Sequence, residues 1–318
     1  MNPLATLYGT VVQTRNGLYD RGKLPIGKLR GPVVSIGNLN VGGSGKTPFL
    51  IALGKLLQQR GIAFDVLSRG YRRATRGVAL VDPAGSPRDF GDEPILIVRK
   101  LGVPVVVGED RYQAGQFAEQ RFGPQLHLLD DGFQHRRLAR DFDIVLITPS
   151  DTRDTLLPTG RLREPLSSLA RADAVVLTNE ATSDGLPLGN RQVWRASREI
   201  IAPRLDDPCI AFCGLARPTN FFADLASAGL TVAGTKSFAD HHAYTKADVR
   251  KLRFLGERYG AAAFVTTEKD AINLGPLISE LTPLHVVPVQ LRLQAPDAAM
   301  DWVLSRIAAA NAHPHETI

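Results

Sequence analysis

The chain has 318 residues, 44% of them hydrophobic, and a formal net charge of +6. This length and composition indicate a globular protein with two ordinary α/β domains or one large one, and they exclude a largely disordered chain. The charge favours anionic partners such as phosphates, acidic lipid surfaces or nucleic acid, without choosing among them. The two cysteines, Cys209 and Cys213, are too few for a zinc site, so we expect buried free thiols.

The N-terminal segment predicts an amphipathic helix with a basic flank. Its apolar residues at helical spacing are Leu4, Leu7, Tyr8, Val11, Val12, Leu18 and Tyr19, and the basic residues on or after it are Arg15, Arg21, Lys23, Lys28 and Arg30. Such a helix either docks on the domain or lies in a membrane interface, and periodicity alone favours docking. No apolar run approaches the roughly 20 residues of a membrane span, and no signal peptide is recognisable, so we expect a cytoplasmic protein.

Residues 33–47, VVSIGNLNVGGSGKT, read as a buried strand and a glycine-rich loop that opens a helix. The usual phosphate-binding pattern is G-x-x-x-x-G-K-[ST], and Asn40, which tolerates positive φ, stands at its first position. Backbone N–H groups can surround an anion, Lys46 can reach the β- and γ-phosphates, and the Thr47 hydroxyl can bind Mg²⁺. A glycine-rich turn that merely begins a helix is the alternative, and the order of elements favours a nucleoside triphosphate. The predicted site consists of Asn40, Val41, Gly42, Gly43, Ser44, Gly45, Lys46 and Thr47.

The chain then alternates between strands and helices. Basic residues crowd the end of the second strand, where Arg69, Arg72 and Arg73 either hold phosphate or form a solvated loop. Asp92 and Glu93 open a later helix, a position that capping alone also favours for acidic residues. We expect helices at 46–59 and 91–101, and strands at 63–67 and 103–107.

Asp130 and Asp131 follow an apolar strand at 126–129. A strand of this kind that ends in aspartate, downstream of a phosphate loop, is typical of a carboxylate that holds Mg²⁺ directly or through water. Turn-forming aspartates are the alternative, and the phosphate loop favours the magnesium role for at least one of the pair. With further strands at 142–148 and 174–178, we predict an α/β fold: residues 1–30 form the helix and its flank, and 31–181 form a P-loop NTPase-type parallel sheet with helices on both faces.

Residues 182–208 have the composition of a linker, and 209–318 predict a second, smaller α/β domain. We expect its strands at 210–213, 264–267 and 285–289, and its helices at 218–228, 246–259 and 296–310. Between these elements lies SFADHHAYT (237–245), an unusually dense polar connection. Lone histidines are more often structural, but two adjacent histidines beside an aspartate, expected to face the cleft between domains, favour a functional role.

A small-molecule kinase fits these features best among phosphate-handling proteins. A GTPase would need N-K-x-D after a strand, whereas the nearest match, TEKD at 267–270, lacks the asparagine and displaces the lysine. Phosphoryl transfer needs positioning, charge neutralisation and a proton acceptor, which the carboxylate and histidine clusters can supply. A kinase acting on another hydroxylated, anionic metabolite and a nucleotide-dependent switch with slow ATP hydrolysis are the alternatives.

Nine short segments carry a resemblance to a known family. They are SIGNLNVGGSGKTP (35–48), LSRGY (67–71), GDEP (91–94), EDRY (109–112), LDDGFQHR (129–136), LREP (162–165), CGLA (213–216), DHH (240–242) and TTEKD (266–270). Each is weak alone, but in this order, with asparagine before the glycines of the loop, they resemble the tetraacyldisaccharide 4'-kinases of lipid A biosynthesis. The resemblance covers nearly the whole chain.

This resemblance implies an enzyme that transfers the γ-phosphate of ATP to the 4'-hydroxyl of a tetraacylated glucosamine disaccharide 1-phosphate, giving lipid IVA. It implies ATP and Mg²⁺ as cofactors, the lipid A precursor as substrate, no nucleic acid and no obligate protein partner. The expected location is the cytoplasmic face of the bacterial inner membrane, as a peripheral protein. Because these kinases place an N-terminal helix near the lipid, membrane contact through that helix becomes the favoured expectation.

The matched motifs also imply residue roles. Lys46 and Thr47 would serve the triphosphate and Mg²⁺, and Asp92 would be the general base, paired with His241 from the second domain. A carboxylate at a helix start is by itself a weak base, because the helix dipole favours its ionised form. The implied metal ligands are Thr47, Asp130, Asp131 and Glu164, and the implied substrate contacts are Arg72, Arg111 and Arg163. Ala239 stands where the family usually has proline before the Asp-His pair.

Overall fold

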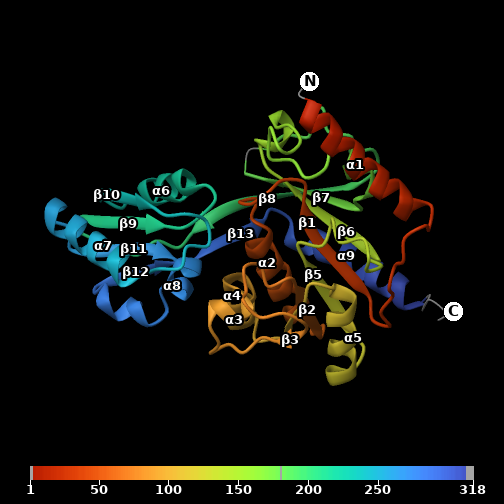
Figure 1. Cartoon of the computed structure of the whole chain (residues 1–318), viewed down its shortest axis with the longest axis horizontal. Helices are drawn as coiled ribbons and strands as arrows, with labels where there is room; N and C mark the ends of the chain where they lie inside the picture. Colours follow the sequence, from red (N-terminus) through yellow and green to blue (C-terminus); the bar gives the residue numbers. More distant parts are fainter. Residues whose placement is uncertain (1–2, 180, 313–318) are drawn as a thin grey trace.

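Two β-sheets organise the residues that this computed structural model describes, 3–179 and 181–312. The strand order is β13-β8-β7-β6-β1-β5-β2-β4-β3 in the larger, nine-stranded sheet and β10-β9-β11-β12 in the smaller, four-stranded sheet. Figure 1 shows them at the centres of a larger and a smaller lobe. This arrangement confirms the predicted fold class. Residues 1–2, 180 and 313–318, which the predicted domain boundaries included, lie outside the described residues.

The larger sheet is mostly parallel and covered on both faces. β1 lies at its centre and pairs in parallel with β5 and β6, and every residue of these three strands is buried. The edge strands β3 and β13 run antiparallel to their neighbours. The strands are β1 Val33–Asn38, β2 Phe64–Ser68, β3 Ala79–Leu80, β4 Val105–Val107, β5 Leu126–Asp130, β6 Phe142–Ile147, β7 Ala174–Thr178, β8 Gln192–Ile200 and β13 Val289–Leu293.

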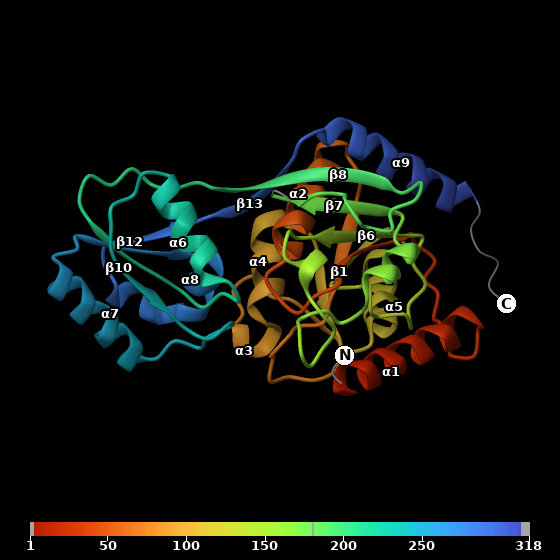
Figure 2. The same ribbon diagram turned by 90° about the horizontal axis from the view of Figure 1, so that it is seen from above.

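Helices cover both faces of this sheet, as the alternation of strands and helices predicts. Residues of α2, α4 and α9 share one core with Val34 of β1, whereas residues of α5 share another core with Val33. Figure 2 shows α9 and α1 on opposite sides of strands β6 to β8. The helices of this lobe are α1 Pro3–Asp20, α2 Lys46–Gln59, α3 Pro87–Phe90, α4 Asp92–Leu101, α5 Arg111–Phe122 and α9 Pro296–Ala312.

The smaller lobe is a parallel sheet between helices. Phe221 of α6 shares a core with Cys209 on one face, and Leu252 of α7 packs with Ile210 on the other. Cys209 and Cys213 are free and buried, as predicted, and burial raises the pKa of Cys213 to about 12. The elements are β9 Cys209–Cys213, α6 Pro218–Ser227, β10 Val232–Ser237, α7 Lys246–Tyr259, β11 Ala263–Thr267, α8 Glu268–Leu274 and β12 Leu284–Val287.

The structure differs from the sequence expectations between the lobes. The segment 182–208, expected to be a linker, contains β8, which pairs with β7 and β13 in the larger sheet. β8 is half exposed and rich in polar residues, so it lacks the apolar run that marks the central strands. The single strand expected at 285–289 is two strands, β12 and β13, which Pro288 separates and which belong to different sheets.

The last helix also differs from expectation, because α9 packs in the core of the larger lobe and not in the smaller domain. Its apolar spacing shows that one face is buried but not which element covers that face. The chain therefore crosses between the lobes at 201–208 and again at Pro288.

The turn after β5 crosses β1 in close contact. A Cβ atom on Gly37 would lie 2.5 Å from Cβ of Phe133 and 2.9 Å from its backbone nitrogen. Phe133 is fully buried, so it has no room to move away. Glycine at position 37 therefore lets the residues that follow β5 lie beside the loop that follows β1.

We expect Gly37→Ala to lower the free energy of unfolding by about 1–3 kcal/mol, because the added methyl group overpacks this crossing. Gly17→Ala is the matched control, since a Cβ there meets nothing within 4 Å and the position lies inside α1. The control should be neutral or stabilising by up to about 1 kcal/mol. Urea denaturation measures both, and equal effects of the two substitutions would contradict the tight crossing.

Candidate active site

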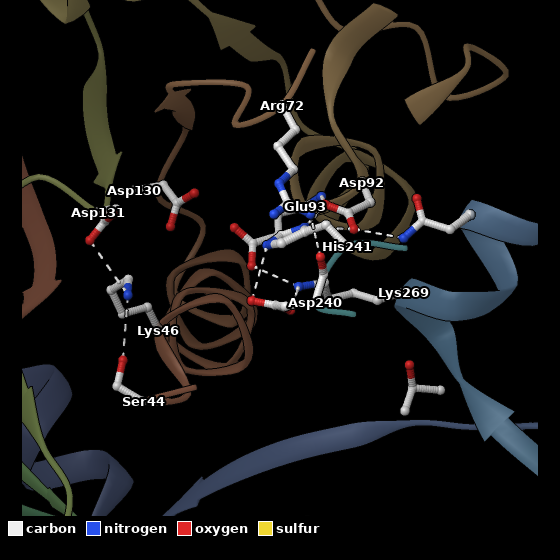
Figure 3. Close-up of polar contacts among 12 residues, drawn as sticks. Ser44, Lys46, Arg72, Asp92, Glu93, Asp130, Asp131, Asp240, His241 and Lys269 are labelled. Atoms are coloured by element: carbon white, nitrogen blue, oxygen red, sulfur yellow. Dashed lines mark hydrogen bonds and ion pairs between the residues drawn. The ribbon is translucent and has the colours of Figure 1, made fainter. Parts of the chain in front are cut away.

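A cavity of about 1020 Å³ lies between the two lobes. The larger lobe contributes the phosphate loop and the aspartates after β5, and the smaller lobe contributes residues after β9, around His241 and at the start of α8. Figure 3 shows Lys46, Asp130 and Asp131 on one side of this region and Asp92, His241 and Lys269 on the other. The residues predicted for the donor and for the acceptor thus converge on one place.

The phosphate loop has the backbone that anion binding requires. Gly42, Gly43 and Gly45 have φ values of 73°, 70° and 85°, which side chains with a Cβ rarely adopt. Lys46 begins α2 and its Nζ lies 3.1 Å from Oδ1 of Asn38 and 3.5 Å from Oδ1 of Asp131. The loop therefore presents backbone N–H groups, a helix N-terminus and an ammonium group to the cavity.

Asn40 holds the loop through its side chain and not through an unusual backbone. It is fully buried, accepts a hydrogen bond of 2.8 Å from Nδ2 of Asn38, and donates its own amide to Asp151. Its φ is not positive, so the tolerance of asparagine for positive φ does not explain its presence. A glycine at this position would lack the side-chain amide that reaches Asp151.

Asp130 and Asp131 differ in their electrostatic environment. Asp130 is 3% exposed, and burial together with the nearby Glu93 and Asp131 carboxylates raises its pKa to about 7. For Asp131, Lys46 and Arg163 outweigh the effect of burial and lower the pKa to about 2. Oδ2 of Asp130 accepts a hydrogen bond of 3.0 Å from Ser68, whereas its buried Oδ1 has no partner among the described residues. A buried carboxylate oxygen without a donor fits a hard cation such as Mg²⁺.

Asp92 and His241 meet across the two lobes. Nδ1 of His241 lies 2.9 Å from both carboxylate oxygens of Asp92, and Nδ2 of Asn273 donates a hydrogen bond of 2.8 Å to the same group. Asp92 is 4% exposed and does not line the cavity, whereas His241 does. Burial opposes ionisation, but the hydrogen bond from His241 and the charge of Lys269 hold the pKa of Asp92 well below its usual range.

Sequence reasoning missed two residues that join this pair. Lys269 Nζ lies 3.2 Å from Glu93 of the larger lobe and 4.0 Å from Asp240, and these acids, with Asp92, raise its pKa against the effect of burial. The signal was the lysine of TTEKD, a segment that contributes to the family resemblance but from which no role for Lys269 was inferred. Asn273 lies one helical turn after Lys269 on α8, and no pattern in the sequence marks it.

The three arginines predicted for the substrate lie in different places. Arg163 lines the cavity and its Nη1 donates to Asp131 at 2.9 Å. Arg72 donates to the backbone oxygen of Asp240 and so links the two lobes. Arg111 is 6% exposed and donates a hydrogen bond of 2.9 Å to the backbone oxygen of Glu109. Its positive charge interacts with the carboxylates of Asp130 and Asp131.

Glu164 connects the cavity to the N-terminal helix. It is 2% exposed, and its Oε2 accepts hydrogen bonds of 2.9 Å from Asn16 of α1 and from Arg171. Its buried Oε1 has no hydrogen-bond partner in the part of the chain that the structure describes. The neighbouring Arg163 accepts a bond from Tyr8 through its backbone oxygen. Helix α1 therefore positions the loop that carries both residues.

Unusual backbone geometry is concentrated around the cavity. Among the described residues, the non-glycine residues with positive φ are Arg72, Asp131, Asn179 and His241. The last three line the cavity, and Arg72 binds Asp240, which also lines it. Strained conformations persist where the surrounding structure holds them, and they are concentrated at functional sites.

Comparison with known proteins identifies relatives over nearly the whole chain. A family described as Tetraacyldisaccharide-1-P 4'-kinase matches residues 1–308. A protein of Koribacter versatilis named Tetraacyldisaccharide 4'-kinase is 50% identical over 96% of this chain and 98% of its own length. One of the same name from Aquifex aeolicus is 39% identical over 86% and 88%. A crystal structure described as LpxK from Aquifex aeolicus in complex with ATP aligns with a TM-score of 0.77 and 34% identity, covering 96% of this chain and 97% of the other.

The pKa of Asp92 is lower in the folded state than in the unfolded state, so the charged carboxylate stabilises the fold. We expect the stability advantage of wild type over Asp92→Asn to be full above about pH 4, near the pKa of an unfolded aspartate. The advantage should shrink as the pH falls below that value. Urea denaturation at pH 7, 5, 4 and 3 measures it, and a gap that widens at low pH would contradict the assigned contacts.

Proposed function

The chain belongs to the tetraacyldisaccharide-1-P 4'-kinase family, and from this membership and the geometry of the cavity we propose how it acts. It transfers the γ-phosphate of ATP to the 4'-hydroxyl of a tetraacylated glucosamine disaccharide 1-phosphate. The observation that carries the proposal is that one cavity joins the phosphate loop of the larger lobe to His241 of the smaller lobe. The first holds a phosphate donor, and the second can accept the proton of an attacking hydroxyl.

The donor side is built from the loop and the acidic pair. The glycine-rich turn and the N-terminus of α2 bind the phosphates, and Lys46 neutralises their charge. Asp130, Asp131 and Thr47 would hold Mg²⁺, and the oxygen of Asp130 that lacks a partner among the described residues supports this assignment. Those residues include no group of three acidic, His or Cys side chains placed to hold a metal ion, so a direct role of Glu164 stays a prediction from the family motif. When bound, Mg²⁺ neutralises charge on the transferred phosphate.

The acceptor side is the pair of His241 and Asp92. Nδ1–H of His241 donates a hydrogen bond to Asp92, which leaves Nε2 free of a proton. Nε2 then accepts the proton of the 4'-hydroxyl while the hydroxyl oxygen attacks phosphorus and ADP leaves. Asp92 fixes the ring and stabilises the charge that His241 acquires. In this scheme His241 contacts the hydroxyl as the general base, and Asp92 acts through His241. The sequence motifs implied the opposite roles, with Asp92 as the base. We exchange the two roles because, of this pair, only His241 lines the cavity.

Helix α1 supplies a surface suited to a lipid substrate. Leu4, Leu7 and Val11 lie three and four residues apart and are 59%, 63% and 59% exposed. Arg15, Arg21 and Lys23 are exposed nearby, and such cations are attracted to anionic head groups. No described helix is long and apolar enough to cross a bilayer. Peripheral attachment to the cytoplasmic face of the inner membrane through α1 is therefore part of the proposal.

The reaction is tested with γ-labelled ATP and Mg²⁺, with and without the disaccharide 1-phosphate in detergent micelles. Label that appears on the disaccharide only when the acceptor is present supports the proposal. Label released as inorganic phosphate at the same rate without acceptor would indicate a nucleotide-dependent switch. Transfer to another hydroxylated anion but not to the disaccharide would indicate a kinase of different specificity.

His241→Ala and Asp92→Ala should each lower kcat by about 10²–10⁴-fold, because general-base catalysis contributes that much. The affinity for ATP should change little, since neither residue belongs to the phosphate loop. His285→Ala, on strand β12 away from the cavity, is the matched control. Steady-state kinetics with the lipid acceptor measure kcat, and a kcat near wild type in either variant would refute the assignment.

Leu7→Ser with Val11→Ser should weaken binding to anionic vesicles by at least about tenfold, because each apolar side chain contributes about 1.5 kcal/mol or more when buried. Vesicle co-sedimentation measures this, while kcat on detergent-dispersed acceptor should stay unchanged. Phe254→Ser is the control, since Phe254 is 60% exposed on α7 of the smaller lobe. Equal vesicle binding by the double variant and wild type would exclude α1 as the contact.

A further inference from the structure

Arg217 lies on the phosphate loop, although it belongs to the smaller lobe. It precedes α6, and its side chain lines the cavity. A Cβ atom placed on Gly43 would lie 3.4 Å from Cγ of Arg217 and 3.5 Å from its Cδ and Nε. The stem of the side chain therefore lies beside the glycine turn that would surround the phosphates, and only a methyl-sized space separates the two.

Among the described residues, 3–179 and 181–312, the guanidinium group of Arg217 has no hydrogen-bond or ion-pair partner. Burial and the neighbouring Arg161 lower the pKa of Arg217, since both disfavour its positive charge, and they outweigh the attraction of the Asp151 and Asp154 carboxylates. The nearby carboxylates are engaged elsewhere, because Asp151 accepts from Asn40 and Thr148, and Asp154 accepts backbone bonds.

Arg161 has a different environment, although it also lines the cavity. Its Nη2 donates a hydrogen bond of 3.0 Å to the backbone oxygen of Val41, and it comes from the larger lobe, like the loop itself. Arg161 therefore fixes the loop. Arg217 instead places an unpaired cation at the loop from the opposite side of the cavity.

We propose that Arg217 is a catalytic residue that donates hydrogen bonds to the terminal phosphates of bound ATP and stabilises the charge that develops during transfer. This inference rests on the proposed kinase function. As the bond from phosphorus to the leaving ADP oxygen breaks and the bond to the acceptor oxygen forms, negative charge spreads over the phosphoryl oxygens and the leaving oxygen. A guanidinium group supplied by a second structural unit is an established way to neutralise such charge.

The position of Arg217 also couples the two lobes to the reaction. Its guanidinium reaches the loop only while the smaller lobe lies against the larger one, as does the contact between His241 and Asp92. One lobe movement would therefore bring both the proton acceptor and the cation into place, which disfavours transfer to water before the acceptor has bound.

The test compares Arg217→Met, which keeps the length of the stem and removes the charge, with Arg217→Lys and with the exposed control Arg250→Met on α7. Arg217→Met should lower kcat by about 10²–10³-fold, as removal of one transition-state donor does. Binding of ADP alone should stay within a few fold of wild type. Binding of ADP with Mg²⁺ and tetrafluoroaluminate, which mimics the transferring phosphate, should weaken in parallel with kcat.

Arg217→Lys should recover part of both losses, and Arg250→Met should match wild type. Urea midpoints of all variants establish that they are folded. A kcat for Arg217→Met within threefold of wild type, or equal weakening of ADP and of the tetrafluoroaluminate complex, would overturn the proposal. If wild type itself fails to phosphorylate the disaccharide, the proposed function fails, and the tetrafluoroaluminate binding still tests the contact between Arg217 and the phosphates.

Discussion

The buried carboxylate of Asp92 joins the two lobes at the point where chemistry is expected. Burying a charge costs several kcal/mol unless it is paired and hydrogen-bonded. Asp92 begins a helix of the larger lobe, whereas its side-chain donors, His241 and Asn273, and the cation Lys269 come from the smaller lobe. Separation of the lobes would expose or unpair these groups. The contacts that hold the lobes against each other are therefore the same contacts that assemble the site.

The chain crosses between the lobes at two places, which attaches the smaller lobe to the larger one. β8 leads into the smaller lobe through 201–208, and β12 returns to β13 across Pro288. The paired β8 and β13 form one edge of the larger sheet, so the smaller lobe is attached through two adjacent strands. The lobes are joined again at the cavity by the contacts of Arg72 with Asp240 and of His241 with Asp92.

The sequence predicted the parts of the site that are local in the chain. Strand, loop and helix around Lys46 follow from apolar runs and glycines within 15 positions, and Asp130 follows its own strand. The pairing of Asp92 with His241 came from family resemblance, because no local pattern relates residues 149 positions apart. Lys269, Asn273 and Arg217 were missed as site residues for the same reason, and β8 was missed because its half-exposed, polar sequence resembles a linker.

The central claim is that one pair of groups, drawn from two lobes, accepts the proton of the hydroxyl. A double-substitution cycle in kcat tests it most directly, with Asp92→Ala, His241→Ala and the combination measured on the lipid acceptor at saturating ATP. If the two residues act as one unit, the combined variant should be about as slow as the slower single variant. Losses that multiply would contradict the account, because they would show that Asp92 and His241 act independently.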